Sequence, residues 1–337
     1  MNKEKIKDIL SFIKNNIPVI VAYVIAAFLT LYEFPYYIDA TGGAIDVSER
    51  VKVENKYDSE GSFNMAYVRE LPGTAVMLFI AKLNPKWDIV KLEDVLLENE
   101  TEEDDRNRNK LLLSESTNNA IRIAYGLAGK KVEIESSDLI ITLVTPEAKT
   151  DVEIGDILLS IDGNKLNSYE EFKSIITSHK AGDTLNFVVR RDDKELKKTA
   201  IIYEEEGEVY VGMGVVLSTK LKTDPELTLE FKDSESGPSG GLMTALAIYD
   251  SLIEYDLTRG LKIVGTGTIE ADGTIGPIGG VKYKLNGAVR KKADLFFVPA
   301  GENYKEALKY KKEYGYDIKI VSVEKISDAV KYLMTLD

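Results

Sequence analysis

The sequence predicts a multidomain protein of the α/β (α+β) class that begins with a transmembrane helix. Its 337 residues are enough for two or three domains, each with its own hydrophobic core. Near the C-terminus, short apolar runs of the buried-strand type alternate with helical patterns, for example Leu295–Pro299 followed by Tyr304–Tyr314. This alternation is typical of a sheet covered by helices. A central stretch combines strand-like runs with one helical pattern, and an uncharged apolar segment lies near the N-terminus.

The composition excludes several functions. The formal net charge is −13 and the pI is about 4.9, which argues against nucleic-acid binding because that needs a basic face. The chain has no cysteine, so disulfides and thiolate metal sites are excluded. Its one histidine, His179, argues against a zinc site. We therefore expect no cofactor and no bound metal.

The N-terminal segment is predicted to anchor the chain in a membrane. Residues 1–16 carry four lysines, and the segment from Ile17 to Tyr32 has no charged residue. The apolar character continues to Ile38, which gives a segment of about the 20 residues that cross a bilayer. We interpret 17–38 as a transmembrane anchor. The lysines predict that residues 1–16 are cytoplasmic and that the chain from about residue 40 onward is extracytoplasmic, at the cell membrane.

Two other interpretations of this segment stay open. A cleaved signal peptide would also begin with lysines and an apolar run. A cut after Ala40 would place the bulky Ile38 where a small residue is needed, so we favour an uncleaved anchor. The third interpretation is a helix buried in a protein core.

The region of residues 41–130 is predicted to form an N-terminal extracytoplasmic part. Ala44–Val47 and Met65–Val68 alternate like strands. The charged run from Glu98 to Arg108 is interpreted as a solvated helix face or loop. Ser116–Ala128 is predicted to be a helix because its apolar residues recur at helical spacing and Gly129 follows its end.

The stretch that organises the chain is Glu235–Gly241. It opens an apolar run that predicts a helix, and Pro238 suits a first helical turn because its missing N–H is not needed there. Ser239 would then lie where unpaired amides and the positive end of the helix dipole converge. The backbone amides of Gly237 and Ser239 are candidates for stabilising an oxyanion.

A nucleophilic Ser239 needs a base, and the sequence leaves few choices. Without cysteine, and with His179 in what looks like another domain, a lysine is the remaining common base for a serine. Lys282 follows a Gly-Gly pair and begins a helical pattern, so we predict that it is the base. Lys284 is the reserve, because two positions along a helix its side chain points elsewhere. A lysine base near neutrality needs its pKa lowered from about 10.4 to about 7–8, which desolvation can supply.

These motifs resemble those of Lon-type proteases. Gly237-Pro238-Ser239-Gly240-Gly241 resembles the nucleophile motif of that family, and Pro277–Lys282 resembles the motif that carries its lysine. Thr266 corresponds to a threonine of the family near the dyad, and we expect it to orient the amine of the base. Gly240 departs from the common alanine, and Ser236 from the common glycine or aspartate. The resemblance covers roughly 211–336 and implies a Lon-type proteolytic domain at 207–337 with a Ser-Lys dyad.

The resemblance implies a serine endopeptidase, while the ATP-binding part of Lon enzymes is not evident. No stretch fits the G-x-x-x-x-G-K-[S/T] phosphate loop. We therefore expect ATP-independent hydrolysis of peptide bonds in unfolded or membrane-proximal proteins. Lon-type domains tend to form rings, so assembly into a homo-oligomer stays open.

Residues 131–206 resemble a PDZ domain. The stretch that carries the resemblance is Val152–Gly163, with its Gly-Asp-Ile-Leu-x-x-Ile-Asp-Gly pattern. The resemblance implies that a peptide adds to the strand at Leu139, Ile140 and Ile141. The loop before this strand lacks the common Gly-Leu-Gly-Phe form.

The order of anchor, PDZ domain and Lon-type domain resembles the membrane-anchored, PDZ-containing Lon-like proteases of Gram-positive bacteria, the YlbL-like family. It implies that the PDZ domain binds protein or peptide substrates or regulates access to the protease. The alternative is a non-catalytic adaptor that binds peptides through its PDZ domain and uses the Lon-like domain as a scaffold. Retention of Ser239, Thr266 and Lys282 together argues against this alternative.

Overall fold

The structure is a computed structural model that describes residues 11–97, 100–166, 168–232 and 234–336. The chain divides into two compact units. The first comprises residues 1–41 and 68–95, and the second comprises residues 42–67 and 96–337. Residues 1–10, most of the predicted cytoplasmic segment, lie outside the described part.

The first unit contains the apolar N-terminal helix and a short paired strand. Residues 11–15 are helical, and the elements that follow are α2 (Ile17–Leu31), the start of β1 (Glu33–Asp46), the end of β3 (Ser62–Thr74), α3 (Ala75–Leu83), β4 (Asp88–Lys91) and the 3-10 helix η1 (Leu92–Asp94). The Thr74 side chain accepts a hydrogen bond from the Met77 N–H and so caps α3. β1 pairs antiparallel with β4, with Tyr36 opposite Lys91.

The predicted transmembrane anchor at 17–38 is wrong as a single helix. α2 ends at Leu31 after 15 residues, and β1 begins at Glu33. A helix of that length spans about 22 Å, less than the hydrocarbon core of about 30 Å. Pro35 cannot donate a helical hydrogen bond, and the surrounding aromatic residues favour a strand. In the part of the chain that the structure describes, no helix is long and apolar enough to cross a membrane.

The second unit is built on a sheet that joins distant parts of the chain. Its strand order is β19-β18-β15-β3-β1, and the neighbours among the first four strands are parallel. The three strands not yet introduced are β15 (Lys262–Gly265), β18 (Leu295–Pro299) and β19 (Lys319–Val323). β1 and β3 contain the strands predicted at Ala44–Val47 and Met65–Val68. Residues of the predicted N-terminal region therefore complete the sheet of the predicted catalytic domain.

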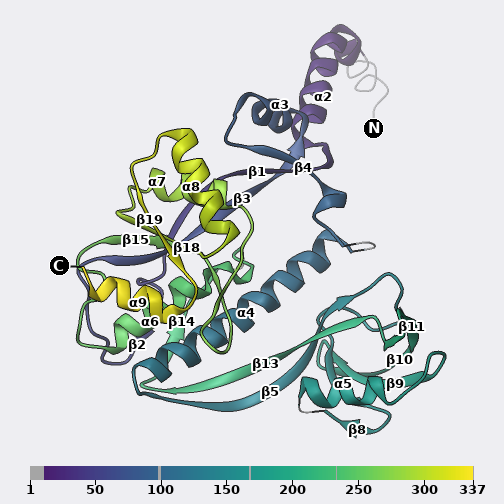
Figure 1. Cartoon of the computed structure of the whole chain (residues 1–337). Coiled ribbons are helices and arrows are strands. Elements are labelled where there is room, and N and C mark those ends of the chain that lie inside the picture. Colours follow the sequence, from purple (N-terminus) through teal and green to yellow (C-terminus); the bar gives the residue numbers. More distant parts are fainter. Residues whose placement is uncertain (1–10, 98–99, 167, 233, 337) are drawn as a thin grey trace. The chain divides into compact units, whose positions relative to one another are not determined.

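Helices cover both faces of this sheet (Figure 1). Along β18, Leu295 and Phe297 pack in one core cluster, while Phe296 and Val298 pack in another. This follows from the alternation of side chains along a strand. The first cluster is covered by α4 (Glu102–Leu127), α6 (Gly241–Leu252) and α9 (Ile326–Met334), and the second by α7 (Val281–Arg290) and α8 (Glu302–Tyr314). The predicted α/β arrangement is confirmed.

Helix α4 is longer than the helix predicted at Ser116–Ala128. It begins at Glu102, where Thr101 and Asp104 form a capping box. Ala120, Ala124 and Tyr125 are buried in the same cluster as residues of α6. Most of the charged run is thus the first part of a core helix. Positions 98 and 99 of the run lie outside the described residues.

Short pairings complete the second unit outside its central stretch. The strands β2 (Val51–Val53) and β14 (Leu227–Leu229) pair antiparallel, as do β16 (Thr268–Ile269) and β17 (Ile275–Gly276). The 3-10 helix η2 (Pro238–Gly240) directly precedes α6.

The central stretch forms a separate sheet with its own core. Its strand order is β13-β5-β7-β9-β10-β6, and β8 pairs with β7. The elements are β5 (Lys131–Val144), β6 (Lys149–Thr150), β7 (Ile157–Ile161), β8 (Asn164–Lys165), α5 (Tyr169–Thr177), β9 (Thr184–Arg191), β10 (Lys194–Ile201) and β13 (Met213–Asp224), with a hairpin of β11 (Tyr203–Glu205) and β12 (Glu208–Tyr210). Phe172 and Ile176 of α5 are buried with Phe187 of β9 in this core.

Candidate active site

The loop that carries Ser239 ends in η2 and continues directly into α6. Gly237, just before the turn, has a φ of +86°, a conformation that favours glycine. Pro238 occupies the first turn, where it lacks an N–H that would be unpaired anyway. The predicted position of Ser239 at the start of a helix is confirmed, and its side chain is partly exposed.

The carbonyl group of Ser239 is held by residues that follow β15. Thr266 Oγ1 donates to it at 3.1 Å and the Gly267 N–H donates at 2.8 Å. Thr266 is fully buried, and its own N–H donates to the Phe297 carbonyl of β18. Thr266 was expected to contact the lysine base. The structure uses its hydroxyl proton for Ser239, although its oxygen still has lone pairs that can accept from an amine.

The two glycines after Ser239 pack closely against neighbouring side chains. A Cβ atom at Gly240 would lie 2.6 Å from the Met65 sulfur, and one at Gly241 would lie 2.3 Å from the Ser116 hydroxyl oxygen. An alanine at position 240, common in the resembling family, would require the flexible Met65 side chain to move.

Helix α4 forms hydrogen bonds with two successive residues of the loop that carries Ser239. The Gly237 N–H donates to the Asn109 carbonyl at 2.9 Å, and Ser116 Oγ donates to the Pro238 carbonyl at 2.9 Å. Both contacts come from a helix that the motif analysis placed outside the catalytic domain. The Gly237 amide, predicted as an oxyanion donor, is therefore already paired.

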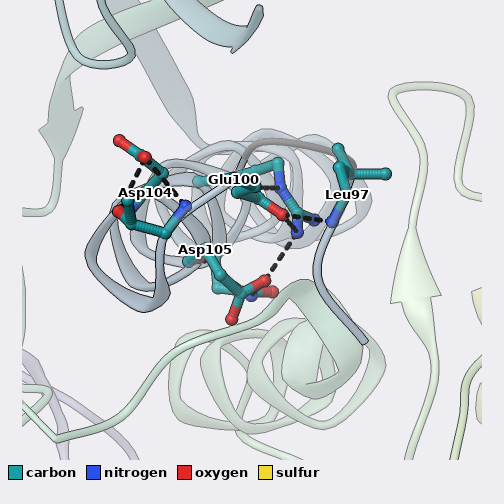
Figure 2. A network of polar contacts seen from close by, with 7 residues as sticks. Leu97, Glu100, Asp104 and Asp105 are labelled. Atoms are coloured by element: carbon teal, nitrogen blue, oxygen red, sulfur yellow. Dashed lines mark hydrogen bonds and ion pairs between the residues drawn. The ribbon is translucent and has the colours of Figure 1, made fainter. Parts of the chain in front are cut away.

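A polar network stabilises the start of α4 next to this contact (Figure 2). Arg108 donates to Glu100 through Nε at 2.8 Å and through Nη2 at 3.0 Å. Asn109 Nδ2 donates to the Asp105 carbonyl and to its carboxylate, both at 3.0 Å. Burial alone would raise the pKa of Glu100, but the bonds from Arg108 and from the Leu97 N–H lower it. The Glu100 side chain is 3% exposed, so the interpretation of this run as a solvated face is wrong there.

An ion pair connects the loop that carries Ser239 with the segment between β1 and β2. Arg50 binds both carboxylate oxygens of Glu235, with Nη2 at 2.7 Å from Oε1. The Lys232 N–H also donates to this carboxylate. Burial opposes ionisation of Glu235, yet these donors lower its pKa. Glu235 is thus a structural anchor rather than a surface charge.

The predicted base, Lys282, lies in the first turn of α7 and is half-buried. Its Nζ is 5.6 Å from the centroid of the Tyr283 ring. An aromatic face attracts a charged ammonium group.

Lys284 has a dry site. It is 4% exposed, and burial lowers its pKa to about 8. No charged or hydrogen-bonding neighbour among the described residues contributes to that shift. Three positions on, a Cβ at Gly287 would lie 3.0 Å from the Gly43 carbonyl oxygen, so α7 approaches β1 closely on this side of the helix. The two lysines point in different directions, as expected for positions two apart in a helix: Lys284 faces the interior, and Lys282 is the more exposed of the two.

The strand predicted to receive a peptide has no free edge. Ile140 pairs with Val216 of β13 on one side and with Ile157 of β7 on the other, and Leu139 is likewise paired on both sides. Ile141 pairs with Val215 and also bonds Gly155 and Asp156 through its backbone. Edge addition at Leu139, Ile140 and Ile141 is therefore blocked by backbone pairing already made.

The edge of this sheet is formed by β13 instead. It is the first strand in the order β13-β5-β7, and α5 contacts it. β13 begins right after Gly212, with Met213-Gly214-Val215, and the register shifts between Gly214 and Val215. This Gly-Met-Gly-Val stretch resembles the Gly-Leu-Gly-Phe form that was sought before β5.

The residues missed by sequence reasoning are Arg50, Asn109 and Ser116, whereas Lys284 was named only as the reserve base. The first three lie far along the chain from Ser239, and nothing local marks them. A Thr-x-x-Asp pattern at Thr101–Asp104 could have located the start of α4. No group of three or more His, Cys, Asp or Glu side chains that could hold a metal ion is found within the described ranges.

Comparison with known families matches two parts of the chain. Residues 126–202 match the PDZ domain, and residues 232–336 match the Lon protease (S16) C-terminal proteolytic domain. Together these matches support a Lon-like protease that carries a PDZ domain.

Individual relatives match only short segments. A Mesorhizobium japonicum protein, mll0638, named as a candidate zinc metalloprotease, is 38% identical over 60 residues, which is 18% of this chain and 16% of that protein. The chain thus spans about a sixth of that relative. The PDZ domain of an SdrC-like protein from Listeria monocytogenes is 24% identical with a TM-score of 0.23, over 25% of this chain and 93% of that one. The corresponding domain from Listeria innocua is 22% identical with a TM-score of 0.22, over 23% and 92%.

Proposed function

We propose that this chain is an ATP-independent serine endopeptidase in which Ser239 is the nucleophile and Lys284 is the general base. The observation that carries the proposal is a buried lysine whose pKa is lowered to about 8, in the same domain that presents Ser239 at a helix start. The match to a Lon proteolytic domain supports it. The proposal keeps the predicted combination of a serine nucleophile and a lysine base but changes the lysine. Lys282 becomes the alternative base.

The chemistry follows from the protonation state of Lys284. With a pKa of about 8, about a tenth of its amines are neutral at pH 7. The neutral amine takes the proton of the Ser239 hydroxyl while Oγ attacks the peptide carbonyl carbon. The resulting ammonium returns that proton to the leaving amine as the C–N bond breaks, which leaves an acyl-enzyme. Water then attacks the ester, loses its proton to Lys284, and the serine recovers a proton as the acid product leaves.

This mechanism sets a geometric requirement. Lys284 Nζ has to come within about 3 Å of Ser239 Oγ in the reacting enzyme, since proton transfer needs hydrogen-bond reach. The Ser239 carbonyl is already fixed by Thr266 and Gly267, so the hydroxyl is presented from a held backbone. Preorganisation of this kind lowers the barrier because little has to move during reaction.

We assign peptide recognition to the outer edge of β13 at Met213–Leu217, before Thr219, whose carbonyl accepts a hydrogen bond from Asn118 of α4. An extended peptide can add there as a further strand, and α5 flanks the position. The peptide would be an unfolded segment of a substrate or a regulating C-terminus. Recruitment of this kind suits an enzyme that acts on unfolded chains without ATP.

We also infer that the catalytic domain acts outside the cytoplasm. The inference rests on the resemblance of the sequence to the membrane-anchored, PDZ-containing Lon-like proteases of Gram-positive bacteria. Protease added to intact cells would degrade the catalytic domain if this is right. Degradation only after lysis would contradict it.

The nucleophile is tested by covalent labelling. A fluorophosphonate probe should label the wild-type chain at Ser239, with no labelling of Ser239→Ala. The matched control is Ser234→Ala, an exposed serine five positions earlier in the same loop, which should label like the wild type. Equal labelling of Ser239→Ala and wild type would contradict the proposal.

A further inference from the structure

Ser116 bonds the peptide group directly before the nucleophile. Its Oγ donates to the Pro238 carbonyl at 2.9 Å, although the two residues lie 122 positions apart. Ser116 is 5% exposed and lies on α4, outside the 232–336 stretch that matches the Lon domain. A hydroxyl so buried needs a partner, and the Pro238 carbonyl is the one it has.

This bond fixes the direction of the Ser239 amide. The Pro238–Ser239 peptide is trans, since Asp224–Pro225 is the cis bond found among the described residues. In a planar trans peptide the carbonyl and the N–H point in opposite directions. Because the carbonyl points to Ser116 on α4, the Ser239 N–H points away from α4.

The surroundings leave this arrangement little freedom. The Gly241 N–H also bonds the Pro238 carbonyl within the turn. A Cβ at Gly241 would lie 2.3 Å from Ser116 Oγ, so the hydroxyl fills the space that this glycine leaves. On the other side of Ser239, its carbonyl is held by Thr266 and Gly267. Both peptide planes that meet at Ser239 are thus fixed.

Of the two amides predicted to stabilise an oxyanion, only that of Ser239 is left available. The Gly237 N–H is paired with the Asn109 carbonyl. In contrast, the Ser239 N–H donates to no backbone carbonyl outside its own turn in the described part of the chain. It therefore remains the candidate donor to an oxyanion at this turn.

We propose that Ser116 is a positioning residue for the oxyanion site: its hydroxyl holds the Pro238–Ser239 peptide so that the Ser239 N–H points at the developing oxyanion. This inference rests on the proposed function, because an oxyanion forms only if Ser239 attacks a carbonyl. Donors aimed in advance at developing charge act on the transition state rather than on substrate binding. Ser116 touches no reacting atom and acts through the peptide it holds.

The test compares Ser116→Ala, Ser116→Cys and the control Thr117→Ala in the full chain. Cysteine keeps the volume but is a weak donor, which guards against a variant that merely folds badly. Thr117 is the next residue of α4, and its hydroxyl bonds the Leu113 carbonyl within the helix. Cleavage of fluorescein-labelled casein gives kcat and KM, and inhibition by a peptide boronate reports on transition-state affinity.

We expect both Ser116 variants to lose about tenfold in kcat with KM within about twofold, and to bind the boronate about tenfold more weakly. Thr117→Ala should match the wild type in all three quantities. If both Ser116 variants keep the wild-type kcat and boronate affinity while Ser239→Ala is inactive, the inference is wrong and the proposed function stands. A change in KM or in melting temperature alone also overturns it. If wild type does not cleave, or Ser239→Ala still does, the proposed function fails and this inference fails with it.

Discussion

Arg50 and Glu235 form a bidentate ion pair across 185 positions of the chain. The side chains are only 16% and 12% exposed. Together with the bonds from Asn109 and Ser116, the pair means that the loop carrying Ser239 is held by residues from before the PDZ domain. The catalytic domain is therefore assembled from two separate stretches of the chain, with the PDZ domain between them.

Removing Arg50 should destabilise the protein and lower its activity. Arg50→Met leaves the Glu235 carboxylate largely buried without its guanidinium, and we expect a loss of about 2–3 kcal/mol in the free energy of unfolding. Urea denaturation measures it. The control is Lys52→Met, whose partner Glu230 is 62% exposed, and which should cost less than about 0.5 kcal/mol. Equal effects of the two substitutions would show that the buried pair has no special weight.

The pH dependence of catalysis should report Lys284. The base acts as the neutral amine, so kcat/KM should rise about tenfold per pH unit below pH 8 and level off above it. At pH 6 the value should be about a hundredfold below the plateau. A profile of casein cleavage from pH 6 to 10 measures this. A curve that is flat across this range, or that inflects near pH 10, would rule out a base with the lowered pKa.

The stability of the protein should rise with pH in an unusual window. The pKa of Lys284 is about 8 in the folded chain and 10.5 ordinarily, so between these values the unfolded chain binds more protons. The contribution of Lys284 to folding is therefore most unfavourable below pH 8 and improves by about 3 kcal/mol as the pH rises to 10.5.

The variants are Lys284→Met and, as a control that removes no titratable side chain, Thr117→Ala. The difference in unfolding free energy between wild type and Lys284→Met should change by about this amount from pH 7 to pH 10.5. For Thr117→Ala the difference should stay constant. A constant difference for Lys284→Met as well would mean that Lys284 is not desolvated in solution.

A peptide should bind the PDZ domain along β13. We expect a peptide with apolar last residues, a free carboxylate and one benzoylphenylalanine to crosslink to residues of β13 and α5, mapped by mass spectrometry. β13 is one edge of the sheet, whereas Leu139–Ile141 are paired or bonded on both sides. The control is β7, which pairs with β5 on one side and with β9 on the other. Crosslinks confined to β10 or β6 would place the peptide elsewhere.

The sequence predicted what local patterns determine. The turn at Gly237–Gly241 and the helix after it follow from a proline, two glycines and an apolar run, and the structure confirms them. The change from helix to strand at Glu33 was not predicted, because the apolar run was given more weight than Pro35 and its aromatic neighbours.

What the sequence did not show depends on contacts between distant residues. Lys282 and Lys284 lie in one helix and differ in burial, and the close approach of that helix to Gly43 of β1 at Gly287 could not be read from the sequence. The pairing of β13 with β5 decides which strand forms this edge of the sheet. In sequence, β5 is the first strand of that sheet and β13 is the last. Ser116 and Arg50 contact the loop that carries Ser239 only in the folded chain.

The most direct test of the account is casein cleavage by the full chain without ATP, for wild type, Ser239→Ala, Lys284→Ala and Lys282→Ala. The account predicts cleavage by wild type, loss of at least a thousandfold in kcat for Ser239→Ala and Lys284→Ala, and a change of less than about threefold for Lys282→Ala. Loss in Lys282→Ala with activity retained in Lys284→Ala would contradict the assignment of the base.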